Sequence, residues 1–284
     1  MHKSLIALSL AAAFGLPGPA GGAETAAASP HTFSANFGLF SEYRFRAIAQ
    51  TFGKPAIQGG FDYAHASGLY VGNWNSNVSE GAGYPSSNLE MDYYGGWKKT
   101  WGDWGVDVGG IYYDYPGSDA NRAQGTGITS PKPGGATHFG KVSNKEVYVG
   151  GSWKFLSLKY NHATGDYFSQ PGTKGSHYLD LAATHDFGNG WGINGHLGAF
   201  RLKNWSAGTD LTNADYNDWK LGLTKDLSGW VLGASYIGTN GKGSCSATNP
   251  GYYCFANKLP PTTAGVATRD AAKGTLLLSV SKTF

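Results

Sequence analysis

The sequence predicts an all-β fold: a transmembrane, antiparallel, up-and-down β-barrel of about twelve strands, with short periplasmic turns and long extracellular loops. The first observation is the final segment, 274–284, in which apolar and polar residues alternate as in a strand with two unlike faces. The second is that similar segments recur along the chain, separated by gaps that are alternately short and long. The third is that aromatic residues gather beside the short gaps.

The composition agrees with a barrel and argues against several other classes. The chain holds 44 Gly, 17 Tyr, 14 Phe and 9 Trp, and only 14% of its residues are charged. Its mean hydropathy of −0.31 is polar, but in a membrane barrel only alternate residues face lipid. The net charge of +3 comes without a basic stripe, so we expect no nucleic acid partner.

The start of the chain predicts export. A short basic start precedes the apolar run 5–16, which is too short to cross a bilayer as a helix, and small residues follow at 21–23. We therefore expect a signal peptide over 1–23, a flexible leader over 24–31 and a barrel over 32–284. The expected destination is the bacterial outer membrane, with lipid and lipopolysaccharide as partners.

Segments with a period of two residues define the expected strands. They are 33–45, 56–65, 69–78, 88–99, 104–115, 144–155, 158–165, 176–187, 191–203, 215–225, 230–239 and 274–284. In the first, Phe33, Phe37 and Leu39 share one face, while Asn36 and Glu42 share the other. Because the number is even, the last strand ends on the side where the first began.

The connections justify the pairing of these strands. Tight turns are expected at 67–68, 102–103, 156–157, 188–190 and 228–229, most of them rich in Gly. Long polar loops are expected at 47–54, 79–87, 117–142, 166–175, 204–214 and 240–270. A soluble sandwich has no reason to alternate short and long gaps so regularly, whereas a membrane barrel requires it.

Aromatic residues at the short turns predict a girdle at the periplasmic interface. They are Trp101, Trp104, Phe155, Phe187, Trp191, Trp230 and Phe284. A terminal aromatic residue that closes an alternating strand also resembles the C-terminal signal of outer-membrane barrel proteins. We therefore expect the barrel-insertion machinery to recognise Phe284.

Two cysteines, Cys245 and Cys254, fall in one long loop. In an exported protein such a close pair predicts a disulfide, and without a histidine nearby it makes a poor zinc site. Phosphate loops, zinc spacings and a Gly-x-Ser-x-Gly elbow are missing from the sequence. The expected protein is not an enzyme and carries neither a metal nor another cofactor.

Charged residues on the inward faces are the candidate pore-lining and selectivity residues. They are Glu42, Arg44, Arg46, Asp62, Glu90 and Asp92, with Lys154, Asp218 and Lys220 as further candidates. Opposed charges across a constriction create a transverse field that filters solutes by charge. The alternative is that these residues pair with one another and plug a narrow barrel, since twelve strands lie between filled and open barrels.

Several motifs resemble the TorF family of proteobacterial porins. They are Ser41-Glu42-Tyr43-Arg44-Phe45-Arg46 and the stretches 54–63, 90–95 and 112–117. Glu42, Ala47 and Ala49 depart from a more usual Asp, Gly and Ser, which leaves the local turn open. The resemblance covers nearly all of the chain after the signal and implies an outer-membrane barrel with a passive transport role. It supplies no settled substrate and no catalytic residues.

Two functions are compatible with these patterns. The first is a porin-like channel for passive diffusion of small hydrophilic solutes or ions, which the polar inward face favours. The second is a closed barrel that acts as a surface-binding or structural protein. Its binding surface would be the loops 117–142 and 240–270, with the second loop braced by the disulfide.

Overall fold

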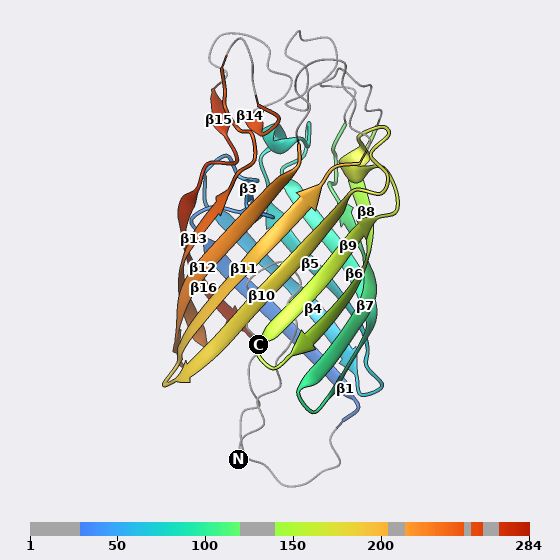
Figure 1. Ribbon diagram of the computed structural model, residues 1–284, viewed down its shortest axis with the longest axis vertical. Coiled ribbons are helices and arrows are strands. Elements are labelled where there is room, and N and C mark those ends of the chain that lie inside the picture. Colours follow the sequence, from blue (N-terminus) through green and yellow to red (C-terminus); the bar gives the residue numbers. More distant parts are fainter. Residues whose placement is uncertain (1–28, 120–139, 204–213, 247–250, 258–266) are drawn as a thin grey trace.

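The protein is a closed antiparallel barrel of twelve strands (Figure 1). The computed structural model describes residues 29–119, 140–203, 214–246, 251–257 and 267–284. The barrel strands are β1 (His31–Phe40), β4 (Ala56–His65), β5 (Leu69–Asn77), β6 (Leu89–Trp101), β7 (Trp104–Asp114), β8 (Ser143–Trp153), β9 (Leu156–Ala163), β10 (His177–Gly188), β11 (Trp191–Arg201), β12 (Tyr216–Leu227), β13 (Trp230–Thr239) and β16 (Thr275–Thr283). The predicted fold class is therefore confirmed, while the predicted signal peptide lies entirely outside the described residues.

Neighbours in sequence are neighbours in the sheet, and the first and last strands close it. Leu39 of β1 lies opposite Val280 of β16 on one side and opposite Ile57 of β4 on the other. Short turns join the strands at one end of the barrel, which we call the turn end. The longer connections gather at the opposite end, which we call the loop end (Figure 1).

The outward face is apolar and exposed. Phe61, Leu221 and Leu276 each leave more than half of their surface uncovered, as side chains that face lipid do. The aromatic residues predicted for the girdle are all exposed and lie beside the short turns. No helix in the described chain is both long and apolar enough to span a membrane.

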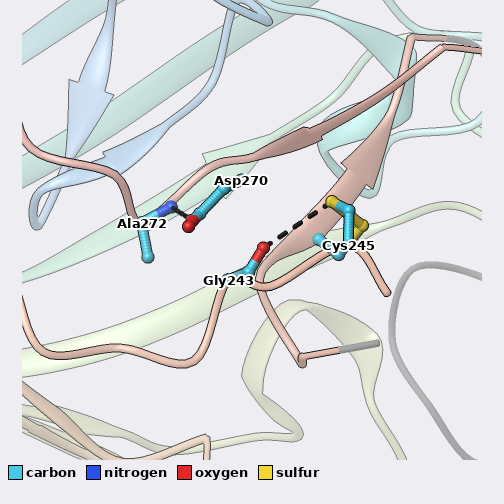
Figure 2. The surroundings of a disulfide bond; sticks show 5 residues. Gly243, Cys245, Asp270 and Ala272 are labelled. Carbon is cyan, nitrogen blue, oxygen red and sulfur yellow. Dashed lines mark hydrogen bonds between the residues drawn. A yellow bond between two sulfur atoms is a disulfide. The ribbon is translucent and has the colours of Figure 1, made fainter. Parts of the chain in front are cut away.

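Additional short elements occupy the loop end (Figure 1). They are β2 (Arg44–Phe45), β3 (Ile48–Ala49), η1 (Glu80–Ala82), η3 (Tyr167–Ser169), β14 (Cys254–Ala256) and β15 (Thr268–Asp270). β2 pairs with β3 and β14 pairs with β15, each as a separate two-stranded sheet. The predicted disulfide between Cys245 and Cys254 is present and holds the start of β14 (Figure 2).

The first strand is shorter than predicted. The pattern predicts a strand over 33–45, but β1 ends at Phe40, which lies opposite Ala56, the first residue of β4. Beyond this point the chain has no partner on the β4 side. After Ser41, whose amide donates to the Leu278 carbonyl, it leaves the wall. Arg44 and Arg46 therefore lie inside the barrel mouth and not on the first strand, which corrects their expected place.

Candidate functional site

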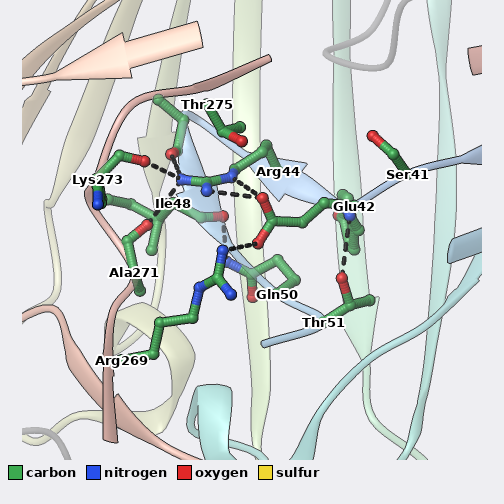
Figure 3. A network of polar contacts seen from close by, with 12 residues as sticks. Ser41, Glu42, Arg44, Ile48, Gln50, Thr51, Arg269, Ala271, Lys273 and Thr275 are labelled. Carbon is green, nitrogen blue, oxygen red and sulfur yellow. Dashed lines mark hydrogen bonds and ion pairs between the residues drawn. The ribbon is translucent and has the colours of Figure 1, made fainter. Parts of the chain in front are cut away.

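The chain from 41 to 55 folds into the loop end of the barrel, and we call it the inward segment. Arg44 fastens it. Its Nε donates to Glu42 Oε2 at 2.8 Å, and its Nη1 donates to the carbonyl oxygens of Ala47, Ala271 and Lys273 at 2.9–3.1 Å (Figure 3). The arginine side chain is only 2% exposed. The bonds to Ala271 and Lys273 tie the inward segment to the connection between β15 and β16, and those to Glu42 and Ala47 brace the segment itself.

The sequence around Ala271 presents its carbonyl to Arg44. The Asp270 carboxylate accepts the Ala272 amide at 2.9 Å, which fixes a tight turn (Figure 2). The Ala271 carbonyl also accepts the Ala49 amide at 2.9 Å, so β3 is held at the same place. Arg269 adds a longer contact of 3.8 Å to Glu42 (Figure 3).

Arg46 crosses the lumen to β8. Its Nη1 and Nη2 donate to the two oxygens of Glu146 at 3.0 and 2.7 Å, a bidentate pair that is almost fully buried. The guanidinium lies 4.5 Å from the Tyr178 ring centroid and 4.8 Å from that of Phe45. Burial alone would lower the pKa of Arg46, but the Glu146 carboxylate raises it well above its ordinary value. The arginine therefore stays charged and paired.

Aromatic side chains fill the mouth around the inward segment. Phe168 of η3 has a left-handed backbone (φ 47°, ψ 46°) and lies 5.7–5.9 Å, centroid to centroid, from Phe45, Tyr113 and Tyr115. Such a conformation in a bulky residue is costly and is often retained for function. Together these rings, with Tyr84 stacked on Tyr115 at 3.7 Å, form what we call the aromatic plug.

A small cavity of about 50 Å³ remains in this mouth. Four connections at the loop end contribute to its wall: those between β1 and β4, β5 and β6, β9 and β10, and β13 and β16. The lining residues are mostly aromatic: Phe45, Ile48, Gln50, Ala82, Tyr84, Tyr167, Phe168, Gln170, Phe200, Tyr216, Tyr252, Tyr253 and Phe255. Burial, followed by the Glu90 carboxylate, raises the pKa of Tyr84. Its hydroxyl therefore keeps its proton and donates to Gln50 at 2.7 Å.

Two carboxylates lie side by side on β6 beneath the plug. Glu90 and Asp92 face inward and are only 1% and 6% exposed. Glu90 accepts a hydrogen bond of 3.1 Å from Tyr43, whereas Asp92 Oδ1 has no hydrogen-bond partner among the described residues. The same is true of Trp74 Nε1, although Trp74 lies directly opposite Asp92 in the register.

Farther towards the turn end the lumen holds more pairs. Asp62 accepts from Tyr94 at 2.6 Å, and Asp107 accepts from Lys159 at 3.1 Å. In the middle of the barrel, His196 lies between Asp180 and Asp218, at 3.1 and 3.2 Å. No group of three or more potential metal ligands occurs in the described residues.

The structure brings most of the predicted site residues into the lumen, but not Lys154. This residue follows β8 in the turn to β9 with φ 53°, its side chain is 51% exposed, and it lies 4.0 Å from Asp103. Its expected inward position is wrong, because the strand ends at Trp153. Asp218 and Lys220 face inward from β12, as expected.

Sequence reasoning passed over several lumen residues. Glu146, Asp107, Lys159 and His196 all form ion pairs inside the barrel. Each occupies an inward position of its strand, so alternation was a sufficient signal for placing them. Alternation could not predict which oppositely charged residue each of them pairs with.

Comparison with known proteins finds barrels of low similarity. The KdgM porin aligns over 88% of this chain and 98% of its own, with a TM-score of 0.48 and 8% identity. OmpT, an outer membrane protein of Vibrio cholerae, aligns over 89% and 97%, with a TM-score of 0.40 and 13% identity. These likenesses go no further than the barrel fold. Among curated proteins, none is similar enough in sequence to count as a relative.

A family model provides the assignment. It matches residues 24–263, which is most of the chain, and it describes a bacterial protein of unknown function (Gcw_chp). Its description does not carry the TorF name, so that finer resemblance stays a prediction. The chain belongs to the Gcw_chp family.

Proposed function

We propose that the protein is a narrow outer-membrane channel for small hydrophilic solutes or ions, constricted at its loop end by the inward segment. The observation that carries this proposal is a gradient along β6. Its inward residues change from buried Glu90 and Asp92, through partly exposed Tyr94, to exposed Lys98. A solvent-accessible, polar lumen therefore opens at the turn end and narrows towards the loop end, while the outer wall suits lipid.

The inward segment has the features of a constriction that can move as a unit. Beyond Ser41 its backbone does not pair with a strand of the barrel wall. Side-chain bonds, chiefly those of Arg44 and Arg46, hold it, together with backbone bonds to Ala271 and Ser79. Residues with left-handed backbones lie within it, at Arg46 and Ala47 and again at Phe52 and Gly53. Loss of its anchors would leave the wall intact, because β1 and β4 pair independently of it.

Single-channel recording in a planar lipid bilayer tests the proposal. The wild-type protein is expected to give small conductance steps, and Arg44→Ala is expected to give larger ones because the inward segment loses its two contacts with the carbonyls of Ala271 and Lys273. Lys154→Ala serves as the matched control, since it removes a cation from an exposed turn. Folding of each variant is checked by the mobility of the unheated protein on a gel.

A closed barrel that binds partners through its loops is the second candidate. The observation in its favour is the packing of the mouth, where Phe168, Tyr115 and Phe200 are almost fully buried. If folded wild-type protein and folded Arg44→Ala both fail to conduct, this second function replaces the first. Conductance that either protein produces, and that a bilayer without protein does not show, supports the channel function over the second candidate.

A further inference from the structure

Arg44 and Arg46 are each paired with a carboxylate, while the partly exposed Arg269 makes a longer contact of 3.8 Å with Glu42. Arg44 pairs with Glu42 at 2.7 Å, and Arg46 pairs with Glu146 at the same distance. Each guanidinium donates to several acceptors and is nearly inaccessible. Neither therefore presents an uncompensated positive charge to a passing ion, although the sequence makes them the obvious filter residues.

Glu90 and Asp92 have no such compensation. Neither has a cationic side chain within 4.0 Å in the described part of the chain. The donors that reach Glu90, the hydroxyls of Tyr43 and Tyr115, are neutral. Any charge that these two carboxyl groups carry is therefore negative and uncompensated. The region beneath the aromatic plug is negative whenever either group is ionised.

Two buried acceptors near Asp92 have no donor among the described residues. They are Asp92 Oδ1 and Asn144 Oδ1, and both residues are more than nine-tenths buried. They lie on either side of Tyr113 in the register of β6, β7 and β8. Buried acceptors without partners are costly, and a cation or its hydration water can satisfy them.

Elsewhere in the lumen the inward charges nearly balance, so the net sign comes from Glu90 and Asp92. Away from the turns and from the contact between Arg44 and Glu42, seven inward carboxylates face four cations and one histidine in the described chain. The carboxylates are Asp62, Glu90, Asp92, Asp107, Glu146, Asp180 and Asp218, and the cations are Arg46, Lys98, Lys159 and Lys220, with His196 between two of the carboxylates. Low-dielectric walls strengthen the resulting field.

We propose that the channel prefers cations over anions, and that Asp92, with Glu90 beside it, is the residue that sets this preference. The inference rests on the proposed function, and it names the class of solute that the constriction favours: alkali ions and small solutes that carry an ammonium group. Arg44 and Arg46 hold the constriction in place and do not select ions.

The reversal potential across a potassium chloride gradient tests this inference. The wild-type channel is expected to pass potassium more readily than chloride. Asp92→Asn keeps the shape of the side chain, removes its charge and leaves no partner unpaired. By Coulomb's law in water, a unit charge ~6 Å from the path changes ion occupancy by about threefold, so the permeability ratio is expected to fall by at least that factor.

Two further variants keep the test decisive. Glu90→Gln is expected to lower the ratio as well, which provides a second measurement should Asp92→Asn fold poorly. Asp103→Asn is the matched control, because it removes a carboxylate from an exposed turn, and its ratio is expected to equal that of the wild type. A channel that conducts without cation preference, or whose preference survives both lumen substitutions, overturns the inference alone. Folded protein that never conducts overturns the proposed function and the inference with it.

Discussion

The two ends of the lumen differ, although the same strands line both. At the loop end, inward side chains such as Glu90 and Glu146 are buried against the inward segment and the aromatic plug. At the turn end, inward Lys98 and Thr100 of the same β6 strand are exposed. The barrel wall therefore supplies a polar lumen along its whole length, and the connections at one end decide where it is closed.

The buried ion pair in the mouth gives the largest expected effect. Arg46→Ala leaves Glu146 buried without its partner, and loss of one member of a buried pair costs about 3–5 kcal/mol. The free energy of unfolding, measured by denaturant titration with tryptophan fluorescence, is expected to fall by this amount. Arg46→Met combined with Glu146→Gln is expected to recover most of the loss. A single substitution that costs nothing would show that the mouth does not contribute to folding.

Removal of the disulfide is expected to give the second largest loss of stability, and this loss is local to the loop end. Cys245→Ser with Cys254→Ser removes a cross-link of this size worth about 2–4 kcal/mol, but the barrel strands lose no contact. Local opening exposes the backbone to protease. Tryptic cleavage after Lys242, which precedes the first cysteine, is therefore expected to accelerate. Equal acceleration at Lys154, in the turn end, would contradict this restriction.

Glycine substitutions compare the packing of the mouth with that of the outward face of β8 near the turn end. A methyl group on Gly81 would overlap the Ala256 carbonyl oxygen, so η1 or β14 must shift, whereas a methyl group on Gly151 meets open space apart from the Gly105 carbonyl at 3.9 Å. Overpacking of this kind costs about 1–3 kcal/mol. Denaturant titration is expected to show this loss for Gly81→Ala and almost none for Gly151→Ala. Equal losses would contradict the contrast between the packed mouth and the outward face of the wall.

The smallest effect is expected at the turn end. Lys154→Ala removes an exposed ion pair with Asp103, and such pairs contribute about 0–1 kcal/mol. The unfolding curve of this variant is expected to overlay that of the wild type. A large fall in the free energy of unfolding would mean that side-chain contacts at the turn end stabilise the protein as much as those at the loop end.

Most of the wall could be predicted because its physical requirement is local. Each strand must place apolar residues on one side and polar residues on the other, and this alternation is visible within ten residues. The predicted ranges 56–65 and 230–239 coincide with β4 and β13. The pair of cysteines likewise needed only their separation and the exported context.

The mouth could not be predicted because its contacts are distant in sequence. Phe45 continues the alternation of the first strand, but its ring contacts Tyr113 and Phe168 and not lipid. Alternation predicts that a residue such as Phe45 lies in apolar surroundings. It does not distinguish lipid from the aromatic side chains inside the mouth. Likewise, Arg46 and Glu146 are one hundred residues apart, and nothing near either of them identifies the other.

The fastening of the inward segment has a consequence for assembly. Arg44 follows the first strand of the barrel, and the carbonyls that hold it, those of Ala271 and Lys273, precede the last. Arg44 can reach these carbonyls only when β1 pairs with β16, because the arginine follows one of these strands and the carbonyls precede the other. In a sheet that is still open, the inward segment cannot reach its anchoring carbonyls. Barrel closure and constriction of the lumen therefore occur in the same step.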